Sequence, residues 1–282
     1  MKGDEKVKYS FNTWCYGSFP TWLPAYPIEV VVDRLAAIGY DAIEIGCAAP
    51  HCWPAYLSRE RREALRRHVE GRGLVVSSVL PAPGGGPGCN VASCIGEERA
   101  WSIAHYKEVV QLGAQLGAGV VLYIGGWRAF GTSACEAKKW CADALYAVAT
   151  EAGQHGLRVA VEPTPADSNV IESSEDALDL LEVVGLDNVG VMLDTFHVLY
   201  RNEVMSDYAH RMGRHLIHTH WADYGRAAPG DGGADFSGLA QALHDIDYQG
   251  FVCMEVGFNR RDVDPDALAR RSLAYVKRVM GD

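Results

Sequence analysis

Eight short and mostly apolar segments recur along the chain, and each is followed by a stretch in which apolar residues repeat with helical spacing. Most of these segments run almost continuously through Val, Ile, Leu and Ala, which is typical of parallel strands that are buried on both faces. We therefore predict eight strands, at residues 8–14, 42–47, 74–80, 120–126, 158–163, 189–195, 216–223 and 251–258.

The intervening stretches place apolar residues at positions i, i+3, i+4 and i+7, so that each forms one apolar helical face. Helices are predicted at residues 27–39, 58–73, 97–117, 135–156, 173–185, 236–246 and 266–281. Three of them end where a left-handed residue is expected to close the helix, at Gly39, Gly117 and Gly156. Ser173 or Ser174 and Ser237 are the predicted N-caps, because their hydroxyls can accept a hydrogen bond from a free backbone N–H group.

Eight successive strand–helix units predict a closed parallel (β/α)8 barrel, that is, a single TIM-barrel domain over residues 1–282. An open dinucleotide-binding sheet is less well supported, because no GxGxxG follows the first strand. Residues 81–96 are too rich in Gly and Pro to form an element. They are predicted to be either a mobile loop over the barrel mouth or a passive surface loop.

Composition and charge narrow the class of protein. The chain has 282 residues, of which 48% are hydrophobic and 22% are charged, as in a packed globular protein. Its formal net charge of −10 argues against a nucleic acid as the main partner. Neither a signal peptide nor a bilayer-spanning segment is recognisable, so no membrane partner and a cytoplasmic location are expected. The eight cysteines form no CxxC pair, which is typical of reduced thiols.

Polar residues end the last four predicted strands. They are Glu162, Asp194, His220 and Glu255. In a parallel barrel these strand ends meet at one mouth, where three buried carboxylates would repel one another unless a cation lay between them. Three oxygens and one imidazole suit Mn²⁺, Mg²⁺ or Co²⁺ better than a structural zinc ion. The alternative is that each acid is a separate ion-pair or cap residue.

Three histidines compete for the ligand position on the seventh strand. His218 and His220 share one face of the strand because side chains alternate, whereas His215 lies near the start of the strand. His220 is the later of the pair and therefore nearer to the mouth. We expect His218 one layer deeper, as a hydrogen-bonded core residue.

Four motifs carry a resemblance to a known family. They are "VEP" at 161–163, "LDTFH" at 193–197, "HTHWADYGRAAPG" at 218–230 and "MEV" at 254–256. With them the chain resembles the xylose isomerase-like superfamily of sugar isomerases and epimerases, and within it the ketose 3-epimerases that act on D-tagatose and D-allulose. The resemblance implies one divalent cation, with Mn²⁺ preferred, bound by Glu162, Asp194, His220 and Glu255. It also implies that the two glutamates act as the acid/base pair, and that His197 and Arg226 contact the substrate.

The loop after the fifth strand departs from this pattern. Many 3-epimerases carry a substrate-binding Glu six positions after the strand-end Glu, where this chain has Ser168. The loop "EPTPADSNV" is more similar to that of fructoselysine 3-epimerase-like proteins, and a loop shorter by one residue would put Asp167 in that place. Glu44 and Trp127, near the ends of the second and fourth strands, are further candidates for substrate binding, with core packing as the alternative for each.

The function that this resemblance implies is ketose, or ketose-adduct, 3-epimerisation by proton transfer through a metal-stabilised enediolate. Alternatives on the same centre are aldose–ketose, hydroxypyruvate or inosose isomerisation, and β-elimination by a C-glycoside deglycosidase subunit. An AP endonuclease would need further zinc ligands and a basic groove, neither of which is evident. A non-enzymatic sugar-binding barrel would not need three converging carboxylates. The superfamily implies a homo-oligomer, as dimer or tetramer, or a hetero-oligomeric subunit.

Overall fold

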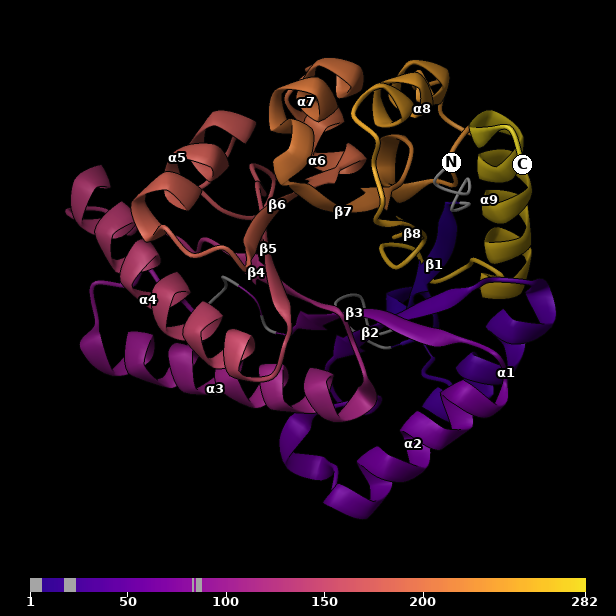
Figure 1. Cartoon of the computed structure of the whole chain (residues 1–282), viewed down its shortest axis with the longest axis horizontal. Helices are drawn as coiled ribbons and strands as arrows, with labels where there is room; N and C mark the ends of the chain where they lie inside the picture. The colour runs from indigo at the N-terminus through magenta and orange to yellow at the C-terminus, as the bar shows by residue number, and fades with distance from the viewer. Residues whose placement is uncertain (1–6, 18–23, 83, 85–87) are drawn as a thin grey trace, which may run out of the picture.

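A closed barrel of eight parallel strands forms the centre of the molecule (Figure 1), in a computed structural model that describes residues 7–17, 24–82, 84 and 88–282. Neighbouring strands follow chain order, and β1 pairs with β8 to close the sheet. The strands are β1 (Lys8–Asn12), β2 (Ala42–Cys47), β3 (Val75–Pro81), β4 (Val120–Ile124), β5 (Arg158–Glu162), β6 (Val189–Asp194), β7 (Leu216–Trp221) and β8 (Phe251–Met254). The predicted (β/α)8 barrel is confirmed.

Helices surround the strands on the outside of the barrel. The α-helices are α1 (Ile28–Ile38), α2 (Arg59–Gly71), α3 (Gly96–Leu116), α4 (Ala134–Gln154), α5 (Ser174–Val184), α6 (Thr195–Tyr200), α7 (Met205–Met212), α8 (Phe236–Asp245) and α9 (Pro265–Met280). Short 3-10 helices are η1 (Thr13–Tyr16), η2 (Pro54–Tyr56), η3 (Gly213–His215) and η4 (Tyr224–Arg226). Two helices were not predicted, α6 and α7, because each is too short to display a helical repeat. Among the described residues, no helix is both long and apolar enough to cross a bilayer.

The predicted helix ends are mostly confirmed. Gly39 and Gly117 adopt left-handed conformations, with φ of 101° and 79°, and Gly156 does so one residue after His155 closes α4. Ser173 caps α5 by accepting from the N–H of Asp176. The Ser237 cap is wrong: Asp235 caps α8, because its carboxylate accepts from the N–H of Gly238 and Ser237 already lies in the first turn.

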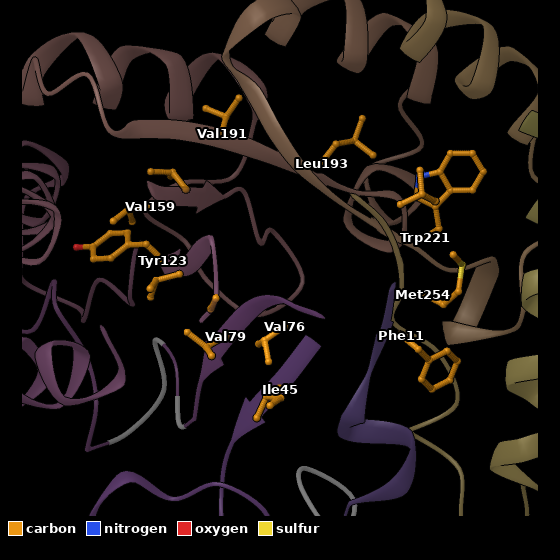
Figure 2. Close-up of a cluster of buried hydrophobic side chains, with 14 of the residues drawn as sticks. Phe11, Ile45, Val76, Val79, Tyr123, Val159, Val191, Leu193, Trp221 and Met254 are labelled. Atoms are coloured by element: carbon orange, nitrogen blue, oxygen red, sulfur yellow. The ribbon is translucent and has the colours of Figure 1, made fainter. Parts of the chain in front are cut away.

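Alternation of side chains along each strand divides the interior into two regions. One set points outward and packs beneath the helices, as Figure 2 shows for Tyr123, Val159 and Leu193 among others. The other set fills the barrel itself, where Leu122, Met192 and other apolar residues form a smaller cluster. The same inward-facing set contains the polar residues of the candidate site, and the strand register pairs Asp194 with His220.

Candidate metal centre

Four side chains from β5, β6, β7 and the end of β8 meet at the carboxyl end of the barrel. His220 Nδ1 lies 3.9 Å from Glu162 Oε1, 3.9 Å from Asp194 Oδ2 and 3.2 Å from Glu255 Oε2. None of the four residues is more than 4% exposed. The structure therefore brings together, out of contact with bulk water, the whole set that the sequence indicates as metal ligands.

Arg226 enters the same cluster from η4. Its Nη1 atom donates to Asp194 Oδ2 at 2.7 Å and forms an ion pair with Glu255 Oε2 at 2.5 Å. The guanidinium also lies over two aromatic rings, 4.2 Å from the centroid of Phe196 and 5.1 Å from that of Phe258. These contacts fix the position of one buried positive charge beside two of the three carboxylates.

The two glutamates of the cluster differ in their affinity for a proton. Burial and the nearby charges of Asp194 and Glu255 raise the pKa of Glu162 well above its usual value. Burial also opposes ionisation of Glu255, but Arg226 and His220 outweigh it and lower the pKa of Glu255. The raised pKa favours a protonated Glu162, and the lowered pKa favours an ionised Glu255. An acid/base pair requires such a difference in pKa.

Glu44 lies in the barrel beneath this cluster and not at its mouth. Its Oε1 atom accepts from Asn12 Nδ2 at 2.7 Å and lies 2.7 Å from His220 Nε2. Its Oε2 atom accepts from Ser78 Oγ at 2.5 Å and lies 2.8 Å from His218 Nε2. Glu44 is fully buried and both oxygens are occupied by protein groups. These contacts favour the alternative given above for Glu44, a place in the packed core, and His218 occupies the deeper hydrogen-bonded position expected of it.

The cluster is suited to a divalent cation because of the ring nitrogen that faces it. His220 Nδ1 makes no hydrogen bond within the described part of the chain, although three carboxylate oxygens lie within 3.9 Å of it. Burial favours the neutral ring, but Glu44 and Glu255 outweigh it and raise the pKa of His220 well above its usual value. The negative charge around Nδ1, which would hold a proton there, would equally attract a metal ion. Three carboxylates and one imidazole are a suitable set of ligands for such an ion.

His197 and Asp167 lie beside the carboxylates on the substrate side. His197 Nε2 is 3.7 Å from Asp194 Oδ2, 3.9 Å from Glu162 Oε1 and 3.5 Å from Asp167 Oδ2. Burial lowers the pKa of His197 to about 3, so the ring is neutral. The Asp167 side chain is 66% exposed, whereas Ser168 is buried and donates to the Gly126 carbonyl. Of the two loop residues considered above, Asp167 is the one that faces the cluster.

The loops after β3, β4 and β5 are joined to one another by two asparagines. Asn90 accepts from the Trp127 N–H at 2.8 Å and donates to the Trp127 carbonyl at 2.7 Å. Asn169 binds the N–H and carbonyl of Arg128 in the same way. The Trp127 backbone is thereby fixed while its side chain stays half-exposed, and its contact with substrate stays a prediction.

These contacts also bear on the glycine-rich loop after β3. Residues 83 and 85–87 of that loop lie outside the described residues. The segment 89–93 is buried, which disagrees with a passive surface loop for this part.

Three residues of the site were missed by sequence reasoning. Asn12 and Ser78 bind Glu44, and the Asn12 position at the carboxyl end of β1 is a signal that could have found it. Asp223 is fully buried, and its carboxylate accepts from the backbone N–H groups of Tyr224, Gly230, Gly232 and Ala234. It thereby shapes the loop that carries Arg226, whose own φ is 60°.

Comparison with known proteins agrees with this architecture. A family model described as a xylose isomerase-like TIM barrel matches residues 32–279. A D-psicose 3-epimerase from Enterocloster bolteae is 28% identical over 245 residues, which are 83% of this chain and 77% of the relative. A fructoselysine 3-epimerase from Escherichia coli O157:H7 is 24% identical over 248 residues, or 85% of this chain and 89% of the relative.

A solved structure shows the same fold over almost the whole chain. It is a crystal structure of D-psicose 3-epimerase in the presence of D-fructose, with a TM-score of 0.85, 20% identity, and coverage of 98% of this chain and 100% of that chain. The names of these relatives agree with the expected class of enzyme, a carbohydrate isomerase. Because the family match extends over most of the sequence, this chain belongs to the xylose isomerase-like TIM-barrel family.

Proposed function

We propose that this protein is a divalent-metal-dependent sugar epimerase that inverts carbon 3 of a ketose or a ketose adduct. The observation that carries the proposal is the convergence of two buried glutamates, on β5 and at the end of β8, with Asp194 and His220 in one cation-suited cluster. The names of the relatives, D-psicose 3-epimerase and fructoselysine 3-epimerase, support this substrate class.

Glu162, Asp194, His220 and Glu255 would hold the cation. Mn²⁺ is the ion we expect, and Mg²⁺ or Co²⁺ also suits three oxygens and one imidazole. When bound, the cation stabilises the negative charge that develops on the substrate oxygens as carbon 3 loses its proton.

Glu255 and Glu162 move the protons. Glu255, which Arg226 helps to keep ionised, takes the proton from carbon 3, and the protonated Glu162 gives a proton to the opposite face of that carbon. The two carboxyls thereby exchange protonation states, and exchange with solvent restores them for the next turnover. Epimerisation in the reverse direction uses the same two groups with their roles exchanged.

His197, Arg226 and Asp167 orient the sugar. The neutral His197 ring can donate to a substrate hydroxyl without adding charge to the cluster. Arg226 places its positive charge where negative charge develops during the reaction. Asp167, exposed beside His197, can accept from a hydroxyl or bind an amine farther along the substrate.

Deuterium incorporation tests the proposal. The Mn²⁺-loaded protein is incubated in D2O with D-fructose, D-psicose, fructoselysine and a 3-keto glucoside, the metal is removed by chelation, and proton NMR locates the deuterium. We expect deuterium at carbon 3 together with the new epimer. We also expect no new epimer from Glu162→Gln or Glu255→Gln, while the exposed Glu108→Gln control on α3 behaves as the wild type.

Other labelling patterns would replace the proposal with a specific alternative. Deuterium at carbon 1 or 2 indicates an aldose–ketose isomerase, and deuterium at carbon 4 of the keto glucoside indicates a 4-epimerase, the activity named for a relative from Escherichia coli K12. Loss of the aglycone indicates β-elimination.

A further inference from the structure

We propose that Glu44 is a positioning residue: it holds His220 with Nδ1 facing the carboxylates and thereby sets the affinity of the centre for its cation. The inference rests on the metal centre of the proposed function. Glu44 is separated from the cluster by the His220 ring itself, since Nε2 faces Glu44 and Nδ1 faces Glu255.

The donors around Glu44 favour an ionised carboxylate, because each of its oxygens accepts a hydrogen bond from a neighbouring side chain. Asn12 is correctly oriented to donate, because its Oδ1 atom accepts from the Trp14 N–H at 2.7 Å, which turns the amide NH2 toward Glu44. Ser78 Oγ donates to the other oxygen. A carboxylate only accepts hydrogen bonds, so each imidazole nitrogen that faces it must carry the proton.

The tautomer of His220 follows from this contact. With the proton on Nε2 at 2.7 Å from Glu44 Oε1, the neutral ring leaves a lone pair on Nδ1, directed at Glu162, Asp194 and Glu255. Carboxylates that bind the far side of a ligating imidazole in this way fix its orientation and make it a stronger donor to the metal.

A second histidine prevents Glu44 from turning away. His218 Nε2 lies 2.8 Å from Oε2, and the His218 and His220 rings are 5.3 Å apart in an edge-to-face arrangement. Each oxygen of Glu44 therefore serves one ring, and rotation of the carboxylate would break both contacts. Asn12 adds a direct link to the cluster, since its Nδ2 atom also lies 3.3 Å from Glu255 Oε1.

Two substitutions of Glu44 separate its hydrogen bond from its charge. In Glu44→Gln the amide oxygen can still face Asn12 and His220 while its NH2 group donates to Ser78 and His218, so the hydrogen bond survives without the charge. Glu44→Leu removes both. The adjacent serines of β3 supply a graded pair: Ser78 binds Glu44 directly, whereas Ser77 binds Ser10 and the Ile43 carbonyl and reaches Glu44 only through its 3.1 Å contact with Ser78.

The experiment measures binding of the metal alone, by calorimetric titration of the metal-free protein with Mn²⁺ and without any sugar. We expect Glu44→Leu to weaken Mn²⁺ binding by about ten- to a hundred-fold. Glu44→Gln should weaken it less, Ser78→Ala less again, and Ser77→Ala should match the wild type. Circular dichroism and thermal unfolding show which variants are folded.

Equal affinities in folded Glu44→Leu and wild-type protein would overturn the inference. If Glu44→Leu does not fold, the Mn²⁺ affinities of Glu44→Gln and Ser78→Ala provide the test. Affinities of these two variants equal to that of Ser77→Ala would also overturn the inference. Nitrogen-15 NMR of the Mg²⁺-loaded protein gives a second readout, because the proton must be found on Nε2 of His220. Failure to epimerise any sugar leaves these results unaffected. Failure of the wild type to bind metal refutes the proposed metal centre, and the inference with it.

Discussion

Glu44 and Glu162 are both buried glutamates inside the barrel, yet they have opposite electrostatic states. Burial disfavours ionisation of Glu44, but His220 and His218 outweigh it and lower its pKa well below the usual value, with Asn12 and Ser78 completing the set of donors. Burial raises the pKa of Glu162, and its nearest charged neighbours include two further carboxylates. Burial alone therefore does not decide the ionisation of these glutamates, because neighbouring charges and hydrogen-bond donors also shift their pKa values.

This difference corresponds to a division of the barrel into two sides. The proposed ligands come from β5 to β8, whereas the groups that support them, Asn12, Glu44 and Ser78, come from β1 to β3. The supporting side is saturated with hydrogen bonds and has no capacity left for substrate. On the ligand side three carboxylates lie near one buried guanidinium, that of Arg226, so this side can bind a cation and exchange protons.

The largest expected effect is a difference in turnover between variants of Glu162 and Glu44. Glu162→Gln should lower kcat by about 10² to 10⁴-fold, because the group that returns the proton is lost. Glu44→Gln should change mainly the concentration of Mn²⁺ that is required. The measurement is kcat at saturating Mn²⁺ for the substrate that the deuterium experiment identifies. Equal losses of kcat in the two variants would contradict the division.

Removal of the metal should lower the stability of the fold. Mn²⁺ at a hundred times its dissociation constant should stabilise the fold by about 2.7 kcal/mol, since the unfolded chain does not form the site. Thermal unfolding with and without a chelator measures the difference. Asp194→Asn should abolish most of it, and a stabilisation that persists in that variant would place the metal elsewhere.

Substitution of Asp223 tests whether the loop that carries Arg226 supports the ligand side. In Asp223→Asn the amide NH2 group would face the N–H groups of Gly230 and Gly232, which now lie 3.0 and 2.9 Å from the carboxylate. We expect a loss of about 2 kcal/mol in unfolding free energy. We also expect a lower kcat/KM, because Arg226 is displaced.

The control for this prediction is Asp231→Asn in the same loop, an exposed residue paired with Arg271. It should change stability by less than about 0.5 kcal/mol. The loss of kcat/KM caused by Asp223→Asn should shrink when Arg226 is already replaced by Gln. An undiminished loss in that background would show that Asp223 acts on something other than Arg226.

The barrel and the convergence of polar strand ends could be predicted because they depend on the order of residues along single strands. Glu44 and Glu162 could not be distinguished with certainty, since each is an acid in an apolar strand, but one signal was available. Glu162 is the last residue of β5, whereas three strand residues follow Glu44 in β2, which places it deeper in the barrel.

Other features depend on partners that are distant in sequence or on very short elements. The donors of Glu44 lie 32, 34, 174 and 176 residues away from it, so no local pattern indicates them. α6 has six residues and begins directly after Asp194, whose carboxylate caps it by accepting from the Phe196 N–H. A polar residue that serves as both strand end and helix cap leaves no visible boundary.

The smallest effect is expected for Asp176, a carboxylate near the protein surface, where water screens charge. Burial opposes ionisation of Asp176, but hydrogen bonds from Lys138, at 2.6 Å, and from the Glu172 N–H lower its pKa. A lowered pKa adds stability above the unfolded value, about 3.9, and this stability is lost as the pH falls through the folded pKa. Asp176→Asn should therefore cost about 0.5–1 kcal/mol at pH 7 and progressively less below pH 4, as urea unfolding at each pH would show. Because Lys138 is half-exposed, this cost must stay well below the cost of Asp223→Asn. If the stability cost of Asp176→Asn does not change with pH, Asp176 acts as a neutral acceptor for the first turn of α5. In that case donors stabilise an ionised carboxylate only where water is excluded.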